Sequence, residues 1–584
     1  MFVFWRIADD LQPRSRRRAP AREPATAIGG PRHRLLPALL ICLLSGATTA
    51  PSSSAGGHTQ ANQPTGIAMP AVVRGSAAPK TLALLYGSSP TRWLRRGRLT
   101  SAGHIALALL RRAPAHGLSS KRYALPQLQQ RAALLPRDAQ RFDHQLSAAL
   151  LAYCLDLDRG STELDASWRA TGAQAVRGGE RLNAIQRGLA EAIERGELAR
   201  YVNSLLPKEP GYQSLQLALR RYRTIAATGG WQQIPPGPSL AIDSSGPRVA
   251  ALRARLLRTS DLPIERGGGN LFDAALAGAV ERFQRRHGLA ADGRVGEQTL
   301  AALNRSVADK IVQIELNMDR WRALPTALPA DLVMVNVPGY DLRLRLNGRQ
   351  ALDMRVIVGK PESPTPLMAQ HLEQIVFHPY WYPPARLTAR EIYPRLKTDP
   401  GYLAREGFQV LQAQGPAELL PVQAASRVSR LAATWDGRGA LPFRLRQKPG
   451  PRNALGRVKF LLPNRQAIYL HDTPHKALFE RARRAYSHGC IRLEEPARFA
   501  AALLARDQAW DKRRVAQAFA DPARKAVELH RPVAVFLVYF TVVSEGTEVR
   551  FFPDVYGRDK TAPATKPRHQ MARLAQDLAL DHRG

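Results

Sequence analysis

The 584-residue chain has little cysteine and far fewer acidic than basic residues. It also has no apolar run long enough to cross a bilayer comfortably. Its three cysteines, Cys42, Cys154 and Cys490, suggest neither a disulfide framework nor a paired CxxC metal motif. Zinc-finger spacings, a basic zipper and the aromatic signature of RNA-binding domains are missing too, so we expect no nucleic-acid partner. The length excludes a single small binding module and predicts roughly three or four domains.

Basic residues are what the chain has in excess. Lysine and arginine number 85 against 48 aspartates and glutamates, which gives a formal net charge of +37. Such a surplus favours a polyanionic neighbour such as nucleic acid, acidic lipid or an acidic cell-wall polymer, and charge alone does not choose among them. With 45% hydrophobic residues the composition is that of globular proteins, so most of the chain is expected to fold.

The N-terminal region, residues 1–50, is typical of an export signal. Leu35–Leu44 is an apolar run that follows arginines and precedes small residues, as in a secretory signal peptide. The long segment before this run leaves a second interpretation open, an uncleaved membrane anchor. Cys42 lies inside the run and not behind a lipobox, so lipidation is not expected. Residues 51–79, rich in Ser, Gly, Ala and Pro, are predicted to be a flexible linker.

Helical periodicity then dominates up to residue 243. Apolar residues recur at helical spacing, as in Leu146, Leu150 and Tyr153 and again in Leu215, Leu219 and Tyr222. We therefore predict a helical domain over residues 80–243. Cys154 lies in one of these apolar runs and is expected to be a core residue.

Residues 244–304 are predicted to form a bundle of three short helices. Val249, Leu252 and Leu256 mark the first helix, Leu276, Val280 and Phe283 the second, and Leu300 and Leu303 the third. An Asp-Gly turn at 292–293 separates the last two. Residues 305–330 are expected to be a helical connector.

The remainder is β-rich. Residues alternate between apolar and polar in 333–337 and 342–346, and an Asn-Gly turn at 347–348 follows. Further strands are predicted around 354–359, 374–378, 458–462, 467–470 and 533–542. An irregular segment with helical pieces, about 381–442, interrupts this domain of residues 331–560, and residues 561–584 form a tail. The fold class is therefore multidomain α+β.

One group of residues in the β-rich part is suited to catalysis. Thiolate is the reactive form of cysteine, and a neighbouring histidine promotes it, so Cys490 is the candidate nucleophile and His471 the candidate base. Gly489 permits a tight turn that would aim the N–H groups of Gly489 and Cys490 at one point, as a tetrahedral oxyanion requires. No acidic third member is evident, and a backbone carbonyl could orient His471. The alternative is that Cys490 is a small buried hydrophobe.

A zinc site is the other interpretation of these residues. His471, His475, His488 and Cys490 could be a ligand set, but Pro474 disfavours a helix that presents both of the first two imidazoles. We therefore expect neither metal nor cofactor. His488 suits an orienting or substrate-contact role or a structural one, and Arg492 either binds a substrate carboxylate or braces the loop.

The sequence resembles the L,D-transpeptidases with a YkuD-type catalytic domain, whose signature is a histidine, a gap, and then Ser487-His488-Gly489-Cys490. It is similar in particular to a large multidomain subgroup that has an arginine at the position of Arg492. The segment 282–304 resembles a three-helix peptidoglycan-binding domain, with an inert spacer bundle as the alternative. Other matching segments are Arg446-Gln447, 449–451, 453–456, Lys459-Phe460, Pro463-Asn464, Tyr539-Phe540-Thr541, Asn317, Arg320-Trp321, Val335-Asn336, 379–381 and, in a helical scaffold domain, Trp93-Leu94, 116–118 and 212–231. Asp319 and Tyr382 depart from the family pattern, where Glu and Asn are usual.

The resemblance implies an exported, periplasmic acyltransferase in cell-wall biogenesis. Cys490 and His471 would be catalytic, and Gly489, His488 and Ser487 would form or orient the oxyanion site. Substrate contacts are assigned to Arg492, Tyr486, Asn453 and Arg446, the last two with no defined role. The implied partners are the stem peptides and glycan of peptidoglycan, with carbapenem-type β-lactams as inhibitors. Segment 381–442 resembles the subgroup's capping subdomain.

The resemblance further implies a thioester on Cys490 and then a cross-link between two diaminopimelate residues. Three other outcomes remain open: hydrolysis of the thioester by a carboxypeptidase or endopeptidase reaction, attachment of an envelope protein to the wall, and a non-catalytic tether. The intact set of His471, Ser487, Gly489 and Cys490 argues against the tether.

Overall fold

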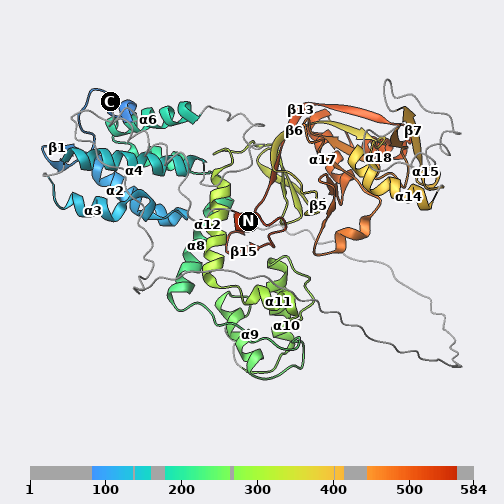
Figure 1. The fold of residues 1–584 in the computed structure, drawn as a ribbon, viewed down its shortest axis with the longest axis horizontal. Helices are drawn as coiled ribbons and strands as arrows, with labels where there is room; N and C mark the ends of the chain where they lie inside the picture. Colours follow the sequence, from blue (N-terminus) through green and yellow to red (C-terminus); the bar gives the residue numbers. More distant parts are fainter. Residues whose placement is uncertain are drawn as a thin grey trace, which may run out of the picture. The chain divides into compact units, whose positions relative to one another are not determined.

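The computed structural model describes residues 82–135, 139–159, 178–263, 269–399, 401–412, 443–508 and 510–561. All of these belong to one of the two compact units of the chain, residues 68–584. The prediction of a multidomain α+β fold is confirmed, because helices fill the first half and a large β-sheet begins at Leu332 (Figure 1). The expected signal or anchor (1–50), linker (51–79), second half of the insertion and tail after residue 561 lie outside the described residues.

Helices make up the first domain as predicted. Its elements are α1 (Ala83–Tyr86), α2 (Ser101–Arg111), η2 (Ala113–His116), η3 (Ser120–Tyr123), α3 (Leu125–Ala132), α4 (Ala139–Arg159), α6 (Gly178–Glu194) and α7 (Leu198–Ser204), with a small hairpin of β1 (Leu94–Arg95) and β2 (Arg98–Leu99). Trp93 is fully buried, and its indole N–H donates to Ser147 on α4 at 2.7 Å. Asp143 receives the backbone N–H of Trp93 at 2.8 Å, so α4 holds this hairpin in place. Cys154 is a fully buried, unpaired core residue, as expected.

Two helices, α8 (Pro210–Ala227) and α12 (Val307–Arg322), run side by side (Figure 1) and share one hydrophobic cluster. The guanidinium of Arg322 is buried between them. It donates to the Tyr212 hydroxyl at 3.1 Å, to the His116 carbonyl at 2.7 Å and to Asp319 at 3.0 Å. A buried cation is tolerable only when it is paired in this way. Asp319, although it departs from the family pattern, therefore still supplies the carboxylate that this pair needs.

The predicted three-helix bundle is present as α9 (Pro247–Arg258), α10 (Ala274–Arg286) and α11 (Glu297–Leu303). Val249, Leu276 and Phe283 are fully buried in its core. The turn before α11 is fastened by Gln284, whose amide donates to Asp292 at 2.7 Å and whose carbonyl accepts from the Gly293 N–H at 3.0 Å. The aromatic and apolar residues of this segment therefore serve its core.

A nine-stranded sheet forms the β-rich domain. Its strands are β3 (Leu332–Asn336), β4 (Asp341–Leu346), β5 (Arg349–Gly359), β6 (Met368–Phe377), β9 (Val458–Leu461), β10 (Tyr469–His471), β11 (Ala485–Ser487), β12 (Ile491–Leu493) and β13 (Lys525–Val538). Their order is β11-β5-β12-β10-β9-β6-β13-β3-β4. Since β5 also pairs with β4, the sheet closes on itself. The long β5 thereby contacts both β11 and β12, the two strands that flank Cys490.

The insertion that we predicted between strands contains α13 (Ala385–Leu387), a π-helical turn η5 (Thr388–Ile392), α14 (Tyr393–Thr398), α15 (Tyr402–Arg405) and β7 (Phe408–Gln412). Strand β7 pairs with β8 (Phe443–Gln447), which returns the chain to the sheet. This part, which we call the cap, has a small core of its own around Ile392, Tyr393 and Leu396.

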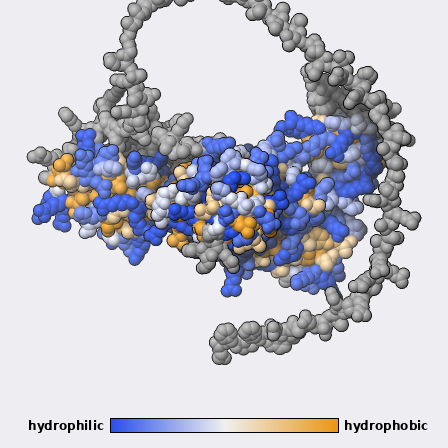
Figure 2. Space-filling view, turned by 90° about the horizontal axis from the view of Figure 1, so that it is seen from below, coloured by the Kyte–Doolittle hydropathy of each residue, from blue (hydrophilic) through white to orange (hydrophobic). Residues whose placement is uncertain are grey.

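Helices and a hairpin complete the domain: η6 (Lys476–Glu480), α17 (Pro496–Gln508), α18 (Lys512–Ala520), β14 (Val542–Glu545), β15 (Glu548–Phe551) and α19 (Arg558–Thr561). None of the helices in the described part of the chain combines the length and the apolar character that a bilayer crossing needs. The face drawn in Figure 2 is mostly hydrophilic, with hydrophobic residues in scattered small patches. Scattered exposed hydrophobics of this kind are normal for a protein surface.

Candidate active site

Strand pairing brings the two residues that we predicted to be catalytic to one place. Strand β10 runs parallel to β12, with Leu470 opposite Ile491 and His471 opposite Arg492. Residues two apart in a strand share a face, so Tyr469 and His471 lie on one face of β10. Arg492 of β12 and Cys490, which directly precedes β12, lie on the matching face. The rings of Tyr469 and His471 meet edge to face, 5.6 Å apart. Leu470 and Ile491 point the other way, into the core.

His471 is buried and held in the tautomer that a general base requires. Its Nδ1 lies 2.5 Å from the carbonyl oxygen of Asp472, to which it donates, so Nε2 carries the free lone pair. This is the backbone orienting group that we considered from the sequence. Burial, with the cation of Arg492 nearby, lowers the pKa of His471 to about 3. The imidazole is therefore neutral at physiological pH.

Cys490 rests as a thiol. Its Sγ lies 3.7 Å from the carbonyl oxygen of Ala467, to which it donates. Burial raises its pKa to about 11, although hydrogen bonds from Tyr469 and the charge of Arg492 act in the opposite direction. The sequence argument expected a thiolate stabilised by histidine. The structure instead has a neutral pair, so the nucleophile has to form by proton transfer during the attack.

The turn before Cys490 is braced by hydroxyl groups. Gly489 has φ +115°, a conformation that side chains rarely adopt, and its N–H donates to the Ser487 hydroxyl oxygen at 3.1 Å. The Ser487 hydroxyl in turn donates to the carbonyl of Cys490 at 2.5 Å. Ser487 is therefore an orienting residue. The expectation of two free amide groups needs correction, because the Gly489 N–H is already engaged and only that of Cys490 is left for an oxyanion.

Thr365 is a second brace that sequence reasoning missed. Its buried hydroxyl donates to the Gly489 carbonyl at 2.8 Å and accepts the Gly359 N–H at 2.9 Å. The Tyr556 hydroxyl supports the same loop, since it donates to the Gly359 carbonyl at 2.6 Å. The contacts of Thr365 with Gly489 and of Tyr556 with Gly359 join positions 124 and 197 residues apart, and no local pattern marks them.

Tyr469 is the other residue missed by the sequence analysis. Its hydroxyl is hydrogen bonded to the sulfur of Cys490 and to Trp381 at the base of the cap, and burial raises its pKa above the usual value. The available signal was its position two residues before His471 in a predicted strand, which puts both side chains on one face. Trp381 also belongs to the family motif, and its backbone pairs with Gln447.

Arg492 is a partly buried cation beside the reacting pair. Its Nε is buried and has no hydrogen-bond partner among the described residues. Burial lowers its pKa, while Cys490 and the carboxylate of Glu391 act to raise it. Of the two roles that we left open, bracing finds no support in these contacts, and carboxylate binding stays a prediction.

The assignment of Asn453 to substrate binding is contradicted. Its side chain is 1% exposed, its amide donates to the carbonyls of Pro379 at 3.0 Å and Lys448 at 2.9 Å, and its oxygen accepts the Leu455 N–H at 2.8 Å. The residue anchors the strand ends at the base of the cap. Both N–H groups of this amide are engaged, and its burial keeps the side chain out of reach of a ligand.

Arg446 and Tyr486 lie at the rim of the site. The guanidinium of Arg446 stacks over the Tyr380 ring at 4.5 Å and donates to Gln409 at 2.8 Å, which ties β8 to β7 and to the motif at the base of the cap. Tyr486 is partly exposed next to Arg481. Their proposed contacts with substrate stay predictions. Tyr382, the second departure from the family pattern, is 51% exposed where the cap begins.

His488 faces the cap. Its Nε2 lies 2.5 Å from Oε1 of Glu391 in the π-helical turn, and Nζ of Lys360 lies 3.6 Å from the same oxygen. Although partial burial acts to raise it, the contacts with His488 and Lys360 hold the pKa of Glu391 below its usual value. No three His, Cys, Asp or Glu side chains within the described ranges lie close enough together to hold a metal ion.

Three separate parts of the chain match known protein families. Residues 330–517 match the YkuD family, described as "L,D-transpeptidase catalytic domain", and this range contains both strands of the site. This chain carries an L,D-transpeptidase catalytic domain. Residues 81–219 match a family described as "Scaffold domain", and residues 245–303 match "Putative peptidoglycan binding domain". The family resemblance stated from the sequence is confirmed.

Individual proteins are similar to parts of this chain. A curated protein of Haemophilus influenzae named "Putative L,D-transpeptidase" is 32% identical over 278 residues, 47% of this chain and 54% of the relative. The chain thus matches about half the length of this relative. Among solved structures, an L,D-transpeptidase of Mycobacterium smegmatis is 14% identical and aligns over 35% of this chain and 58% of its own, with a TM-score of 0.17. Another, from Xylanimonas cellulosilytica, is 17% identical over 52% of this chain and 99% of its own, with a TM-score of 0.16.

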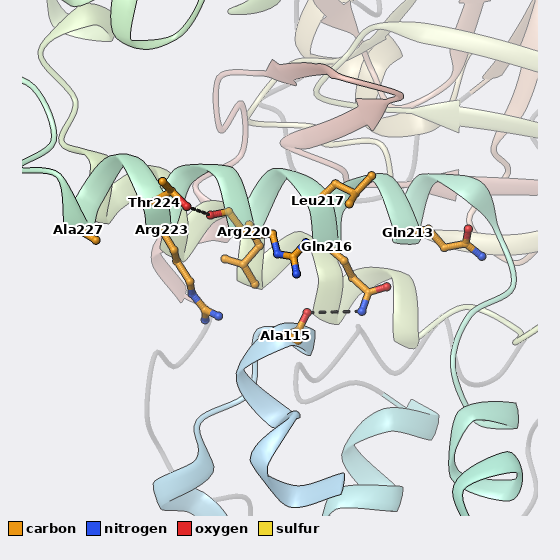
Figure 3. A pocket seen from close by; sticks show the side chains of 9 residues that line it. Ala115, Gln213, Gln216, Leu217, Arg220, Arg223, Thr224 and Ala227 are labelled. Atoms are coloured by element: carbon orange, nitrogen blue, oxygen red, sulfur yellow. Dashed lines mark hydrogen bonds between the residues drawn. The ribbon is translucent and has the colours of Figure 1, made fainter. Parts of the chain in front are cut away.

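A groove elsewhere in the chain is separate from the L,D-transpeptidase site. It has a volume of about 860 Å³ and runs along α8, lined by Gln216, Arg220 and Arg223 and facing Ala115 of η2 (Figure 3). The Gln216 amide donates to the Ala115 carbonyl at 3.5 Å across it, and Arg223 is paired with Glu315. None of its lining residues belongs to the catalytic strands.

Tyr469→Phe tests the contact that the sequence missed. The phenolic hydroxyl stabilises the thiolate more than the thiol, and a hydrogen bond to a charged group contributes roughly 1.5–3 kcal/mol. We therefore expect the pKa of Cys490 to rise and its alkylation by iodoacetamide at pH 8 to slow by about tenfold or more, measured by mass spectrometry of the Cys490 peptide. Tyr402→Phe in the cap is the control and should alkylate like the wild type. Equal rates in all three proteins would remove Tyr469 from the site.

Proposed function

We propose that this chain is a peptidoglycan L,D-transpeptidase that forms diaminopimelate cross-links through a thioester on Cys490. The observation that supports the proposal is the parallel pairing of β10 with β12, which places His471, with Nδ1 engaged by a carbonyl, on the strand next to Cys490 inside a domain of this family. Neutral imidazole beside a thiol is the arrangement that general-base activation of a nucleophile requires.

In the first step the Cys490 thiol proton passes to Nε2 of His471 while Sγ attacks the carbonyl between diaminopimelate and the terminal D-alanine of a tetrapeptide stem. The N–H of Cys490 donates to the developing oxyanion. The carbon–nitrogen bond then breaks, and His471 returns the proton to the amine of the departing D-alanine. A thioester remains on Cys490.

In the second step the side-chain amine of a diaminopimelate residue in a neighbouring stem attacks the thioester. His471 accepts a proton from this amine and passes it to the departing sulfur, which restores the thiol and leaves a new amide bond. Bond energy is conserved between the two amides, so the exchange needs no external energy source. The cap, whose Glu391 contacts His488 beside the site, limits access of water and favours the amine over hydrolysis.

The location and partners follow from the same proposal. An N-terminal export signal or anchor would direct the chain to the periplasm, where peptidoglycan lies. The segment 245–303 supports attachment to the wall, and the net charge of +37 favours the acidic polymer. Carbapenem-type β-lactams are proposed as inhibitors because their strained amide is open to the same attack.

Isolated peptidoglycan sacculi rich in tetrapeptide stems test the function. We expect the purified chain to produce dimeric muropeptides joined between two diaminopimelate residues, with release of one D-alanine per cross-link, measured by mass spectrometry after muramidase digestion. Tripeptide products without dimers would identify a carboxypeptidase, and transfer to an added envelope protein would identify an attachment enzyme. No change in the muropeptides would contradict the enzymatic proposal and favour the tether.

A further inference from the structure

Two basic side chains, Lys360 and His488, contact one carboxylate of the cap near Cys490. Oε1 of Glu391 lies 2.5 Å from Nε2 of His488 and 3.6 Å from Nζ of Lys360, and the charge of Glu391 also acts on Arg492. Lys360 and His488 belong to the sheet side of the site, since the Lys360 N–H donates to the Ser487 carbonyl at 2.9 Å. Glu391 comes from the cap. The cluster of basic side chains therefore belongs to the catalytic side, and it is occupied by a carboxylate from a different subdomain.

The cap does not depend on Glu391 for its own packing. Its core consists of apolar residues such as Ile392, Leu396 and Leu403, and the carboxylate points away from them toward the site. The five-residue turn that presents it, Thr388–Ile392, is π-helical, and such turns are rare and frequent at functional sites. Glu391 is thus placed for the site and not for the core.

The contact is also open to exchange. The side chains of Glu391, Lys360 and His488 are 40%, 37% and 36% exposed. Pairs this exposed contribute little to stability, so another carboxylate can replace Glu391 at small cost. In contrast, the buried Nε of Arg492 has no partner among the described residues, so its N–H is still able to donate to one acceptor.

We propose that Lys360, His488 and Arg492 form a carboxylate subsite of the acyl donor, and that Glu391 occupies it until the substrate carboxylate displaces it and frees the cap. This inference rests on the proposed function for the identity of the donor. The terminal carboxylate of the stem lies only two atoms beyond the nitrogen that leaves, so a subsite beside Cys490 is within its reach. Substrate entry and movement of the cap are then coupled by competition for one set of cations.

Binding in the Cys490→Ala background of the full chain tests the subsite without turnover. The probes are a tetrapeptide ending in D-alanine, its C-terminal amide, and an analogue with lysine in place of diaminopimelate, which keeps the terminal carboxylate. We expect Glu391→Gln to tighten binding of both free acids about threefold and to leave the amide unchanged. Lys360→Met should weaken only the free acids. Tightening of the tetrapeptide and the amide but not of the lysine analogue would assign the subsite to the diaminopimelate carboxylate and overturn the terminal assignment.

Asp399→Asn is the matched control, because Asp399 is another ion-paired carboxylate of the cap, bound to Arg405 and outside the site. It should bind all three peptides like the parent, and thermal melting should be the same for each variant. Weaker binding of the free acids by Glu391→Gln, or equal gains for all three peptides, would overturn the proposal.

Turnover is measured separately with Cys490 intact. Carboxylate-dependent binding without any product would leave the subsite standing and refute the enzymatic function. Product formation with no difference between the free acid and the amide would support the enzymatic function and refute the subsite.

Discussion

Replacing Cys490 with alanine is expected to remove all cross-linking activity while the fold is kept. The sulfur is the only atom of the proposed mechanism that bonds to substrate, and no neighbouring group can replace it. The side chain lies at a partly exposed turn, so its loss leaves little cavity. The measurement is muropeptide analysis after incubation with sacculi, together with a thermal melt.

A carbapenem supplies an independent readout of the same residue. Attack by the Cys490 sulfur on the β-lactam carbonyl breaks the ring C–N bond and leaves a thioester adduct, which intact-protein mass spectrometry detects. We expect one adduct on the wild type, none on Cys490→Ala, and one on Cys154→Ala, the matched control for a buried cysteine. A chelator should not prevent the adduct. Retained transpeptidation in Cys490→Ala, or an adduct on Cys154, would refute the nucleophile assignment.

His471→Gln is expected to slow acylation by about 10²–10⁴-fold, which is the usual contribution of a general base. Glutamine can still donate to the Asp472 carbonyl that orients His471, so the loop should keep its conformation while the base is lost. The acylation rate by a carbapenem, followed by stopped-flow absorbance, is the measurement. A loss of less than tenfold would mean that another group takes the proton from Cys490.

The same assay has a defined dependence on pH. Since the pKa of His471 is lowered to about 3 and that of Cys490 is raised to about 11, neither group changes protonation between about pH 5 and 8. As the pH falls through this window, the imidazole stays basic and the thiol stays protonated, so the wild-type rate should be flat. A resting thiolate and imidazolium pair would instead give a bell-shaped profile with a limb near the usual histidine pKa. A limb in that range would contradict the neutral pair.

Much of the fold was predictable because the patterns are local. Helical spacing in Leu215, Leu219 and Tyr222, and alternation in 333–337, follow from which side of an element faces the core. The structure has α8 and β3 at these positions. The ends of strands were less predictable: the strand expected at 533–542 begins at Lys525 and ends at Val538, because β6 also pairs with residues 525–528, before a bulge, as well as with 533–537. Pairing with a distant strand is invisible to a local pattern.

The residues of the candidate site also differ in how far the sequence predicted them. The nucleophile and base were evident from a short motif, and a backbone carbonyl as orienting group was a reasonable expectation. Asn453 was wrongly assigned to substrate binding. The sequence does not show whether a polar residue in a motif faces solvent or is enclosed by carbonyl groups, as Asn453 is. Thr365 and Tyr469 escaped notice because their roles depend on partners brought near by the sheet.

By itself the sequence determined the types and order of the elements, the family, and the identity of the reacting sulfur and imidazole, since these depend on spacing along the chain. The tertiary structure decided how the groups are charged and what each one touches. The neutral state of Cys490 and His471 is the sum of burial and of charges from other strands. The contact of Glu391 with His488 joins residues 97 positions apart, so it exists only where the fold closes the cap onto the catalytic turn.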